Sequence, residues 1–180
     1  MIRIQRLRVL PVLLISLLLL GCQSRPEGVE PVGNFELDRY LGKWYEVARL
    51  DHRFERGLSE VTAEYSLRPD GQVRVLNSGL PADSDVRNQA EGRAKFAGEP
   101  DVGYLKVSFF GPFYGSYVVF ELDADYQYAF IAGNTTDYLW LLAREPVIEE
   151  SVRQRFMQRA GELGFNTDEL IWVEHDATGE

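Results

Sequence analysis

The sequence predicts an all-β protein: an eight-stranded antiparallel up-and-down β-barrel with one C-terminal α-helix packed outside it and a short final strand. Three observations predict this class. Apolar and polar residues alternate with a period of two through most of the chain after residue 44, turn residues interrupt the alternation at short intervals, and one amphipathic helix pattern follows. A two-sheet sandwich would show the same pattern, but closure into a barrel removes the strand edges that promote aggregation.

The strand pattern is clearest around Asp70-Gly71, a dipeptide typical of tight hairpins. Before this turn, apolar residues alternate with polar ones from Val61 to Leu67. Similar segments are separated by Gly, Pro, Asp and Asn. They predict eight strands, over residues 44–50, 61–67, 72–77, 89–97, 104–110, 116–122, 126–132 and 138–144.

A helix is expected directly after Pro146, because proline is favoured at the first helical position. Gly164 is placed to end it, since glycine readily adopts the left-handed conformation found at helix C-termini. A short helical turn is expected over residues 37–40 and a last strand over residues 170–174. The long helix presents one apolar stripe, which must pack against the outside of the sheet and consists of Ile148, Val152, Phe156, Ala160 and Leu163.

Residues 1–21 are predicted to be an export signal. Arg3, Arg6 and Arg8 precede an apolar run that has the pattern of such signals and is too short to span a bilayer. The run ends in Leu-Leu-Gly followed by Cys22, the only cysteine, which resembles the lipobox of bacterial lipoproteins. This resemblance implies cleavage before Cys22 and its acylation. The alternative is an ordinary secretory signal with a chance cysteine.

Residues 22–34 are polar and contain several prolines and glycines, so they are expected to form an extended, lipidated tether. Two or more acyl chains hold a protein firmly on a membrane, and Gln23 after the cysteine implies sorting of such a lipoprotein to the outer membrane. The predicted location is therefore the outer membrane, with a lipid anchor and with the barrel in the periplasm. Residues 35–175 form the predicted barrel domain and residues 176–180 a tail.

The composition excludes several classes of function. The chain has 19 Lys and Arg against 28 Asp and Glu, a formal net charge of −9, so nucleic acid is not expected as a partner. One cysteine excludes an intrachain disulfide and a Cys-rich zinc site. The two histidines lack the spacing of a zinc hydrolase, and no nucleophile motif is visible. We therefore expect no enzyme, no cofactor and no metal site.

Three short motifs occur in order at strand boundaries. Gly42-Lys43-Trp44 opens the first strand, Asp123-Ala124-Asp125-Tyr126 lies between the sixth and seventh, and Arg144 ends the eighth. Together with the strand count and the C-terminal helix, they resemble the motifs of the lipocalin family.

The resemblance covers residues 34–174, and the segments 48–57 and 107–115 are similar to the bacterial outer-membrane lipoproteins of that family. It implies structural roles for the motifs: Trp44 plugs the closed end of the barrel, and Arg144 lies across it and donates to nearby carbonyls. The remaining motif residues, expected to shape the first strand and a turn rather than bind metal, are Gly42, Asp123, Asp125 and Tyr126.

The barrel interior is the predicted ligand site, because an eight-stranded barrel encloses either packed side chains or one small ligand. The expected ligand is a fatty acid or lysophospholipid, bound for lipid transport, storage or envelope maintenance. The alternatives are a filled core in a structural envelope protein, or a lipoprotein-sorting factor. The inward phase of the seventh strand stays open. If the inward position of Trp44 determines which residues of the other strands point inward, the predicted lining residues are Ala63, Tyr65, Val75, Asn77, Ala94, Phe96, Leu105, Val107, Phe109, Tyr117, Val119, Tyr138, Trp140 and Leu142.

The loops at the open end of the barrel are expected to carry the head-group contacts. Arg53 and Arg56 in the first loop are expected to meet an anionic head group, while aromatic residues over 110–114 guide the acyl chain. Alternatively, these aromatic residues cover one another or form the contact of a homodimer. His52 and His175 are expected to be solvated surface residues.

Overall fold

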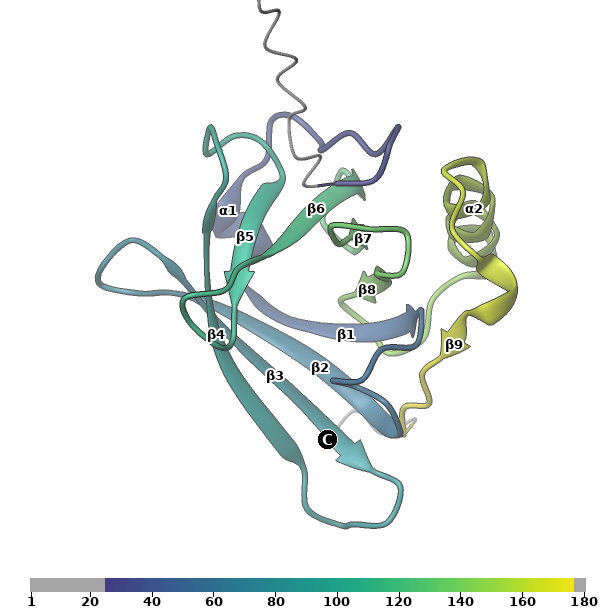
Figure 1. Ribbon diagram of the computed structural model, residues 1–180. Helices are drawn as coiled ribbons and strands as arrows, with labels where there is room; N and C mark the ends of the chain where they lie inside the picture. Colours follow the sequence, from purple (N-terminus) through teal and green to yellow (C-terminus); the bar gives the residue numbers. More distant parts are fainter. Residues whose placement is uncertain (1–24, 177–180) are drawn as a thin grey trace, which may run out of the picture.

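The computed structural model describes residues 25–176 of the chain. The predicted signal peptide and Cys22 lie outside the described residues. Eight strands surround a common interior (Figure 1). They are β1 (Gly42–Arg49), β2 (Leu58–Leu67), β3 (Val73–Pro81), β4 (Asn88–Phe96), β5 (Tyr104–Ser108), β6 (Gly115–Leu122), β7 (Tyr128–Ala132) and β8 (Leu139–Ala143).

Each strand pairs in antiparallel fashion with the next, and β1 pairs with both β2 and β8, so the ring is closed. This confirms the predicted eight-stranded up-and-down barrel. A short strand, β9 (Ile171–Trp172), follows the 3-10 turn η1 (Thr167–Glu169) and bonds to β1 at Ala48 and Arg49. It extends the sheet outside the ring, where the sequence placed a final strand.

Two helices complete the fold. The single turn α1 (Leu37–Tyr40) precedes β1 at one end of the barrel, and α2 (Glu150–Glu162) lies against the outside of the wall (Figure 1). Gly164, with φ of +81°, follows the end of α2. The N–H of Phe165 donates to the carbonyl of Ala160 at 3.0 Å, which satisfies a carbonyl that the helix end leaves free.

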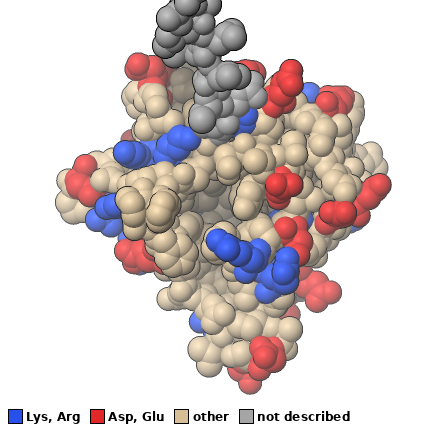
Figure 2. Space-filling model, viewed as in Figure 1, with Lys and Arg blue, Asp and Glu red and all other residues tan. Residues whose placement is uncertain are grey.

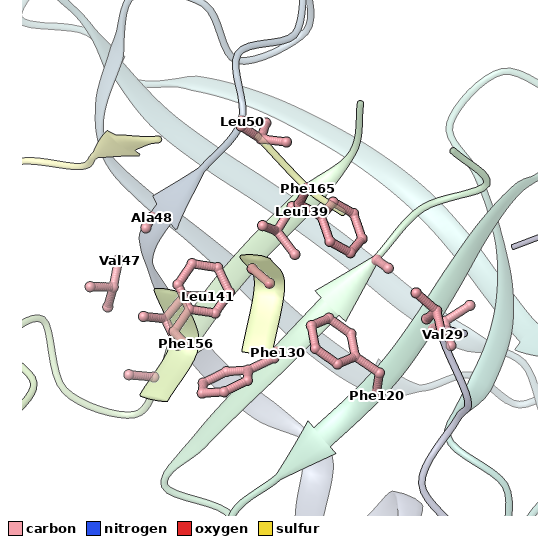
Figure 3. Packing of buried hydrophobic residues seen from close by; sticks show 14 residues of the cluster. Val29, Val47, Ala48, Leu50, Phe120, Phe130, Leu139, Leu141, Phe156 and Phe165 are labelled. Atoms are coloured by element: carbon pink, nitrogen blue, oxygen red, sulfur yellow. The ribbon is translucent and has the colours of Figure 1, made fainter. Parts of the chain in front are cut away.

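A hydrophobic cluster outside the ring, the outer cluster, joins α2 to the barrel wall (Figure 3). Phe156 and Ala160 of α2 are fully buried in it, and the ring centroids of Phe130 and Phe156 lie 4.9 Å apart. The predicted apolar stripe of the helix therefore packs where it was expected. The wall residues of this cluster come from β1, β6, β7, β8 and the residue after β1, and include Val47, Ala48, Leu50, Val118, Phe120, Phe130, Ala132, Leu139, Leu141 and Ala143.

The segment before α1 differs from the sequence prediction of a free tether. Val29 is fully buried in the outer cluster. The N–H of Val32 donates to the carbonyl of Val119 at 2.9 Å, and the carbonyl of Val32 accepts from Gly103 at 2.8 Å. Because two valines gain apolar burial and backbone partners here, this part of the predicted tether belongs to the fold. Any free tether is therefore limited to residues before Val29.

A β-bulge in β1 changes which side chains point inward. The register between β1 and β8 shifts between Glu46 and Ala48, so that Val47 and Ala48 both pack in the outer cluster. Arg49 then follows Glu46 as the next inward residue, although strict alternation from Trp44 would point it outward.

Among residues 25–176, no helix is both long and apolar enough to cross a membrane.

Candidate ligand cavity

Strand register places most of the predicted lining residues on the inner face of the barrel. Ala63 lies opposite both Trp44 and Asn77, and Val107 lies opposite Ala94. A second hydrophobic cluster, the inner cluster, forms there. The predicted lining residues that it contains are Ala63, Tyr65, Val75, Ala94, Phe96, Leu105, Val107, Phe109, Tyr117, Val119, Trp140 and Leu142.

The two other predicted lining residues lie at different places. Asn77 is half-buried and shares the inward phase of Ala63. Tyr138 lies just before β8 and stacks on Trp140, with ring centroids 6.0 Å apart. The seventh strand, whose phase the sequence left open, contributes Ala129 and Ile131 to the inner cluster.

The inner wall is incompletely covered. Phe96, Val107, Phe109, Tyr117 and Trp140 are only partly buried, although the sheet closes around them. These side chains therefore pack against the inner cluster and still keep part of their surface uncovered. Deeper in the barrel, a cavity of about 10 Å³, roughly the space for one water molecule, is lined by Leu37, Tyr40, Tyr65, Val73, Ala94, Leu105, Val107 and Tyr117.

Trp44 and Arg144 close one end of the barrel. The Trp44 side chain is fully buried, and its indole N–H donates to the carbonyl of Tyr40 at 2.8 Å. The Arg144 guanidinium lies 3.9 Å from the centre of an indole ring and donates to the carbonyls of Arg39, Lys43 and Leu41 at 2.7, 2.8 and 3.0 Å. A planar guanidinium can stack and donate several bonds at once, which a lysine cannot.

The other motif residues support this closed end. Gly42 has φ of +92°, a conformation that other residues rarely adopt. Asp123 accepts hydrogen bonds from the N–H groups of Asp125 and Gln127, at 3.0 and 3.2 Å, and so shapes the turn before β7. The hydroxyl of Tyr126 accepts from the N–H of Glu36 at 2.9 Å, which ties this turn to the segment before α1.

Three tyrosine hydroxyls meet above the closed end. The Tyr117 oxygen lies 2.7 Å from that of Tyr40 and 2.9 Å from that of Tyr65. Burial raises the pKa of all three hydroxyls well above the ordinary range, so each keeps its proton. We call these residues the tyrosine triad.

A buried polar cluster lies toward the other end of the interior. Arg49, only 1% exposed, donates to Glu46 at 2.7 Å and to the backbone carbonyl of Glu55 at 2.8 Å. The carboxylate of Glu55 accepts from the indole N–H of Trp140 at 3.2 Å and lies 2.8 Å from Nε2 of His52. These contacts fasten the loop between β1 and β2, residues 50–57, to the inner wall.

The two carboxyl groups of this cluster differ in their affinity for a proton. Burial, followed by the nearby charge of Glu55, raises the pKa of Glu46 well above the usual carboxyl range. Burial acts in the same direction on Glu55, but hydrogen bonds from His52, Trp140 and Glu46 outweigh it and lower the pKa of that carboxyl. Glu46 therefore binds a proton more tightly than Glu55 does.

The prediction of two solvated histidines is wrong. His52 is buried, because it packs against Glu55 and lies 5.3 Å from Trp140 between ring centroids. His175 is half-buried: its Nε2 lies 2.8 Å from the carbonyl of Glu46, and its ring meets that of Tyr45 edge-on. Each histidine gains aromatic contacts that its loop or tail position did not indicate.

Exposed aromatic residues line the rim opposite Trp44. Phe54, in the first loop, and Phe110 and Phe113, between β5 and β6, are 55%, 69% and 78% exposed. The rings of Phe54 and Phe110 stack with centroids 6.5 Å apart, so the two loops meet. Figure 2 shows a hollow in the molecular surface beside these loops, with positive side chains on the side of the loop between β1 and β2.

The two predicted head-group cations differ in their surroundings. The Arg53 guanidinium lies 4.8 Å from the centre of the Phe54 ring, and no ion pair accompanies it among residues 25–176. Arg56 is exposed and pairs with Asp51 at 2.7 Å, and this pair lowers the pKa of Asp51. Arg53 is therefore the more available cation at the rim.

Comparison with known proteins decides the family. A model of the lipocalin-like domain matches residues 35–175, which is more than half of the chain. The chain is a lipocalin.

This lipocalin has close relatives among bacterial envelope proteins. It is 56% identical over 169 residues to the outer membrane lipoprotein Blc of Vibrio cholerae, a match that covers 93% of this chain and 99% of that protein. It is 50% identical over 161 residues to the protein of the same name in Escherichia coli K12, covering 88% and 91%. This lipocalin is an outer-membrane lipoprotein, as the sequence predicted.

More distant lipocalins share the fold. The temperature-induced lipocalin-1 of Arabidopsis thaliana is 34% identical over 151 residues, covering 79% of this chain and 80% of that protein. Insecticyanin of the tobacco hornworm Manduca sexta superposes with a TM-score of 0.67 at 21% identity, covering 86% and 88%. Membership of this family makes the protein a binding protein for a small hydrophobic ligand.

Sequence reasoning missed the buried polar cluster of this lipocalin. One signal was available, because Glu46 stands two residues after Trp44 and so shares its inward phase in a strand. A charge at an inward position requires a buried partner. The identity of that partner, Arg49, depends on the β-bulge, which alternation alone does not reveal.

Proposed function

We propose that this lipocalin carries a single-chain anionic lipid, a fatty acid or a lysophospholipid, with the acyl chain inside the barrel and the head group at the rim. The observation that carries the proposal is the partly exposed apolar wall inside a closed barrel, formed by residues such as Val107 and Phe109. An acyl chain would cover this surface, at a gain of roughly 25 cal/mol for each Å² removed from water.

The closed end limits how far such a chain can enter. The fully buried Trp44 and the Arg144 guanidinium occupy that end, and only about 10 Å³ of cavity remains around the tyrosine triad. The chain would therefore enter from the rim and end near the triad. This favours one extended acyl chain over a bulky two-chain lipid.

The rim supports an anionic head group. Arg53 lies there without an ion pair among the described residues, and Arg56 shares its charge with Asp51. Charge-assisted bonds from arginine to carboxylate or phosphate are stronger than bonds between neutral groups. The head group would meet Arg53 first, while Phe54 and Phe110 contact the first carbons of the chain.

We infer that the protein acts by binding rather than by catalysis. The buried histidine, His52, contacts a carboxylate and aromatic rings, and among residues 25–176 no serine, threonine or cysteine is bonded to it. Lipid at Cys22 would hold the barrel on the outer membrane, facing the periplasm. We expect a Cys22→Ser variant to appear in the soluble periplasmic fraction; retention in membranes after an alkaline wash would contradict this anchor.

The head-group assignment is tested by charge-specific binding. We expect the double variant Arg53→Ala/Arg56→Ala to bind palmitic acid and a lysophospholipid roughly tenfold more weakly, because charge-assisted bonds contribute about 1.5–3 kcal/mol. Hexadecanol, a neutral alcohol of the same length, should bind the variant and the unmodified protein alike. Isothermal titration of the chain from Gln23 measures all three ligands.

The outcomes of this titration separate the alternatives. Equal weakening for acid and alcohol would mean that the arginines only hold the loop in place. Unchanged affinity for the acid would show that neither arginine contributes to the ligand site. A chain that binds neither ligand would favour a structural or sorting protein with a filled barrel.

A further inference from the structure

Two lysines face each other on the outside of the barrel wall. β4 and β5 are antiparallel neighbours, and their register places Lys95 directly opposite Lys106. The residues before them in each strand, Ala94 and Leu105, belong to the inner cluster, so the two lysines point outward. Like charges directly opposite one another destabilise a sheet. The wall therefore carries a local electrostatic cost at this position.

No acidic side chain of the described chain compensates this pair. A third cation, Arg93, lies two residues before Lys95 on β4 and points to the same side. None of the three cations has an ion pair among residues 25–176. The acidic residue of β4, Glu91, is bonded instead to Arg74 at 2.8 Å. In a chain with a formal net charge of −9, these cations lack the acidic partners that other surface arginines have.

Tyrosine rings, rather than acids, hold these cations in place. The Nζ atom of Lys95 lies 4.9 Å from the centre of the Tyr114 ring, and that of Lys106 lies 5.1 Å from the centre of the Tyr104 ring. The Arg93 guanidinium lies 5.9 Å from the centre of the Tyr114 ring. A ring face attracts a cation but carries no net charge, so all three charges stay available to an anion. We call these five residues the cationic face.

The chain enters the fold beside the cationic face. The carbonyl of Val32 accepts from the N–H of Gly103, the residue before Tyr104, at 2.8 Å (Figure 1). Pro26 is buried and stands four residues after Cys22, so at most about 14 Å of chain separates a lipid at Cys22 from the fold. An outer-membrane lipoprotein with so short a link keeps this side of the barrel close to the leaflet that holds it.

The edge of the cationic face toward the rim is apolar and exposed. Phe113 stands directly before Tyr114 and is 78% exposed, and Phe110 in the same loop is 69% exposed. Cations combined with aromatic side chains are typical of protein surfaces that lie in the interface between a membrane and water. The missing negative charge would then come from lipid phosphates.

We propose that the cationic face binds the phosphate groups of an anionic phospholipid leaflet, the leaflet in which the protein is anchored. The phosphates take the place of the acids that Lys95 and Lys106 lack, and the tyrosine rings lie at the level of the head groups. The inference goes beyond the proposed function, which concerns the barrel interior. Because residues 109–114 also belong to the rim, this contact holds one edge of the barrel opening at the leaflet.

The test measures cosedimentation of the chain from Gln23 to Glu180 with lipid vesicles. The residues of both hydrophobic clusters all lie after Gln23, so this chain contains the whole fold without the lipid anchor. Anionic vesicles contain three parts phosphatidylethanolamine and one part phosphatidylglycerol, and neutral vesicles contain phosphatidylcholine alone. Despite the negative net charge of the protein, we expect it to bind the anionic vesicles roughly tenfold more tightly than the neutral ones. About 1 M salt should remove this difference.

Two double variants assign the binding to the cationic face. A basic residue near an anionic leaflet strengthens binding about fivefold, so Lys95→Gln/Lys106→Gln should bind the anionic vesicles roughly tenfold or more weakly. Because this variant also removes the like-charge pair, its melting temperature should equal or exceed that of the unmodified protein. Lys43→Gln/Arg153→Gln is the matched control, since it removes the same charge from two cations that contact aromatic rings elsewhere on the surface. Its affinity should stay within about twofold.

Several results would overturn the inference. Equal binding to anionic and neutral vesicles, or no binding to either, would show that the face does not recognise lipid phosphates. Equal losses in the two double variants would mean that only the total charge matters. A changed oligomeric state of Lys95→Gln/Lys106→Gln in size-exclusion chromatography would assign the face to a second copy of the chain.

Titration with palmitic acid separates this inference from the proposed function. Lys95→Gln/Lys106→Gln should bind palmitic acid within about twofold of the unmodified protein, because both lysines point away from the barrel interior. A chain that binds anionic vesicles but no palmitic acid would contradict the proposed function and leave the cationic face in place. A chain that binds palmitic acid but no anionic vesicles would contradict the cationic face alone.

Discussion

The outer and inner clusters are built from similar apolar residues, yet they are suited to different tasks. At the centre of the outer cluster, Phe130, Leu141 and Phe156 are fully buried between the wall and α2. On the inner wall, Val107 and Phe109 keep exposed surface although the barrel closes around them. Since hydrophobic stabilisation scales with the apolar area removed from water, the outer cluster stabilises the fold and the inner wall is left for a ligand.

The two clusters also differ in polar content. The buried residues of the outer cluster are all apolar, whereas the interior adds the tyrosine triad and the hydrogen bond from Arg49 to Glu46. Buried polar groups contribute little net stability, but they position hydrogen-bond donors and charges. Substitutions in one region should therefore change stability and substitutions in the other should change binding.

The largest expected effect comes from removing a ring in each region. Phe156→Ala in the outer cluster should lower the free energy of unfolding by about 3–5 kcal/mol, which is the usual cost of truncating a buried aromatic residue. Phe109→Ala, the same substitution on the half-buried inner wall, should cost less than half as much. Urea denaturation of the chain from Gln23 measures both. Equal losses would contradict the division of tasks.

A smaller effect is expected at the closed end. Arg144→Ala should lower the free energy of unfolding by about 2 kcal/mol, since it removes charge-assisted bonds to backbone carbonyls and the contact with Trp44. Affinity for palmitic acid should stay within about twofold, because the site lies above this seal. Arg144→Lys should restore little of the lost stability. If Arg144→Ala left the free energy of unfolding unchanged and abolished binding of palmitic acid, Arg144 would belong to the ligand site rather than to the seal.

The smallest expected effect is a change in pH dependence. Glu46 has a raised pKa in the folded protein, so folding favours its protonated form. The stability that this proton contributes is complete below the ordinary carboxyl pKa, and it is lost as the pH rises toward the folded-state pKa. In the Glu46→Gln variant, the side chain keeps nearly the same shape but no longer gains or loses a proton. It should flatten the decline in unfolding free energy at pH values above the ordinary carboxyl pKa, by at most roughly 1.4 kcal/mol per pH unit.

Unfolding experiments across this pH range, with the Glu46→Gln variant beside the unmodified protein, check the assignment. The lowered pKa of Glu55 acts in the opposite direction: its stabilisation is present above the ordinary carboxyl pKa and is lost as the pH falls. Identical pH profiles for both proteins would show that folding does not raise the pKa of Glu46.

The fold could be predicted from the sequence because its signals are local. Period-two alternation, Asp70-Gly71 and the stripe ending at Leu163 each depend on neighbours in the chain. The Trp44–Arg144 seal joins residues a hundred positions apart, and only the family resemblance pointed to it.

The remaining features depend on contacts that local patterns do not contain. The bulge after Glu46 turns Arg49 inward, and a polar, proline-containing segment packs through Val29 and Val32. His52 is buried because the first loop folds back onto Trp140. Each of these outcomes results from tertiary packing that overrides a local preference.

The most direct test of the central claim is to fill the inner wall and ask whether lipid is lost. The chain from Gln23 and its Val107→Trp variant, produced in the same cells, are compared by native mass spectrometry and by urea denaturation, with Leu67→Trp at an exposed site as the control. We expect an acyl lipid bound to the unmodified protein and to the control, none bound to Val107→Trp, and free energies of unfolding within about 1 kcal/mol of one another. Lipid retained by Val107→Trp, or absent from all three proteins, would contradict a ligand site inside the barrel.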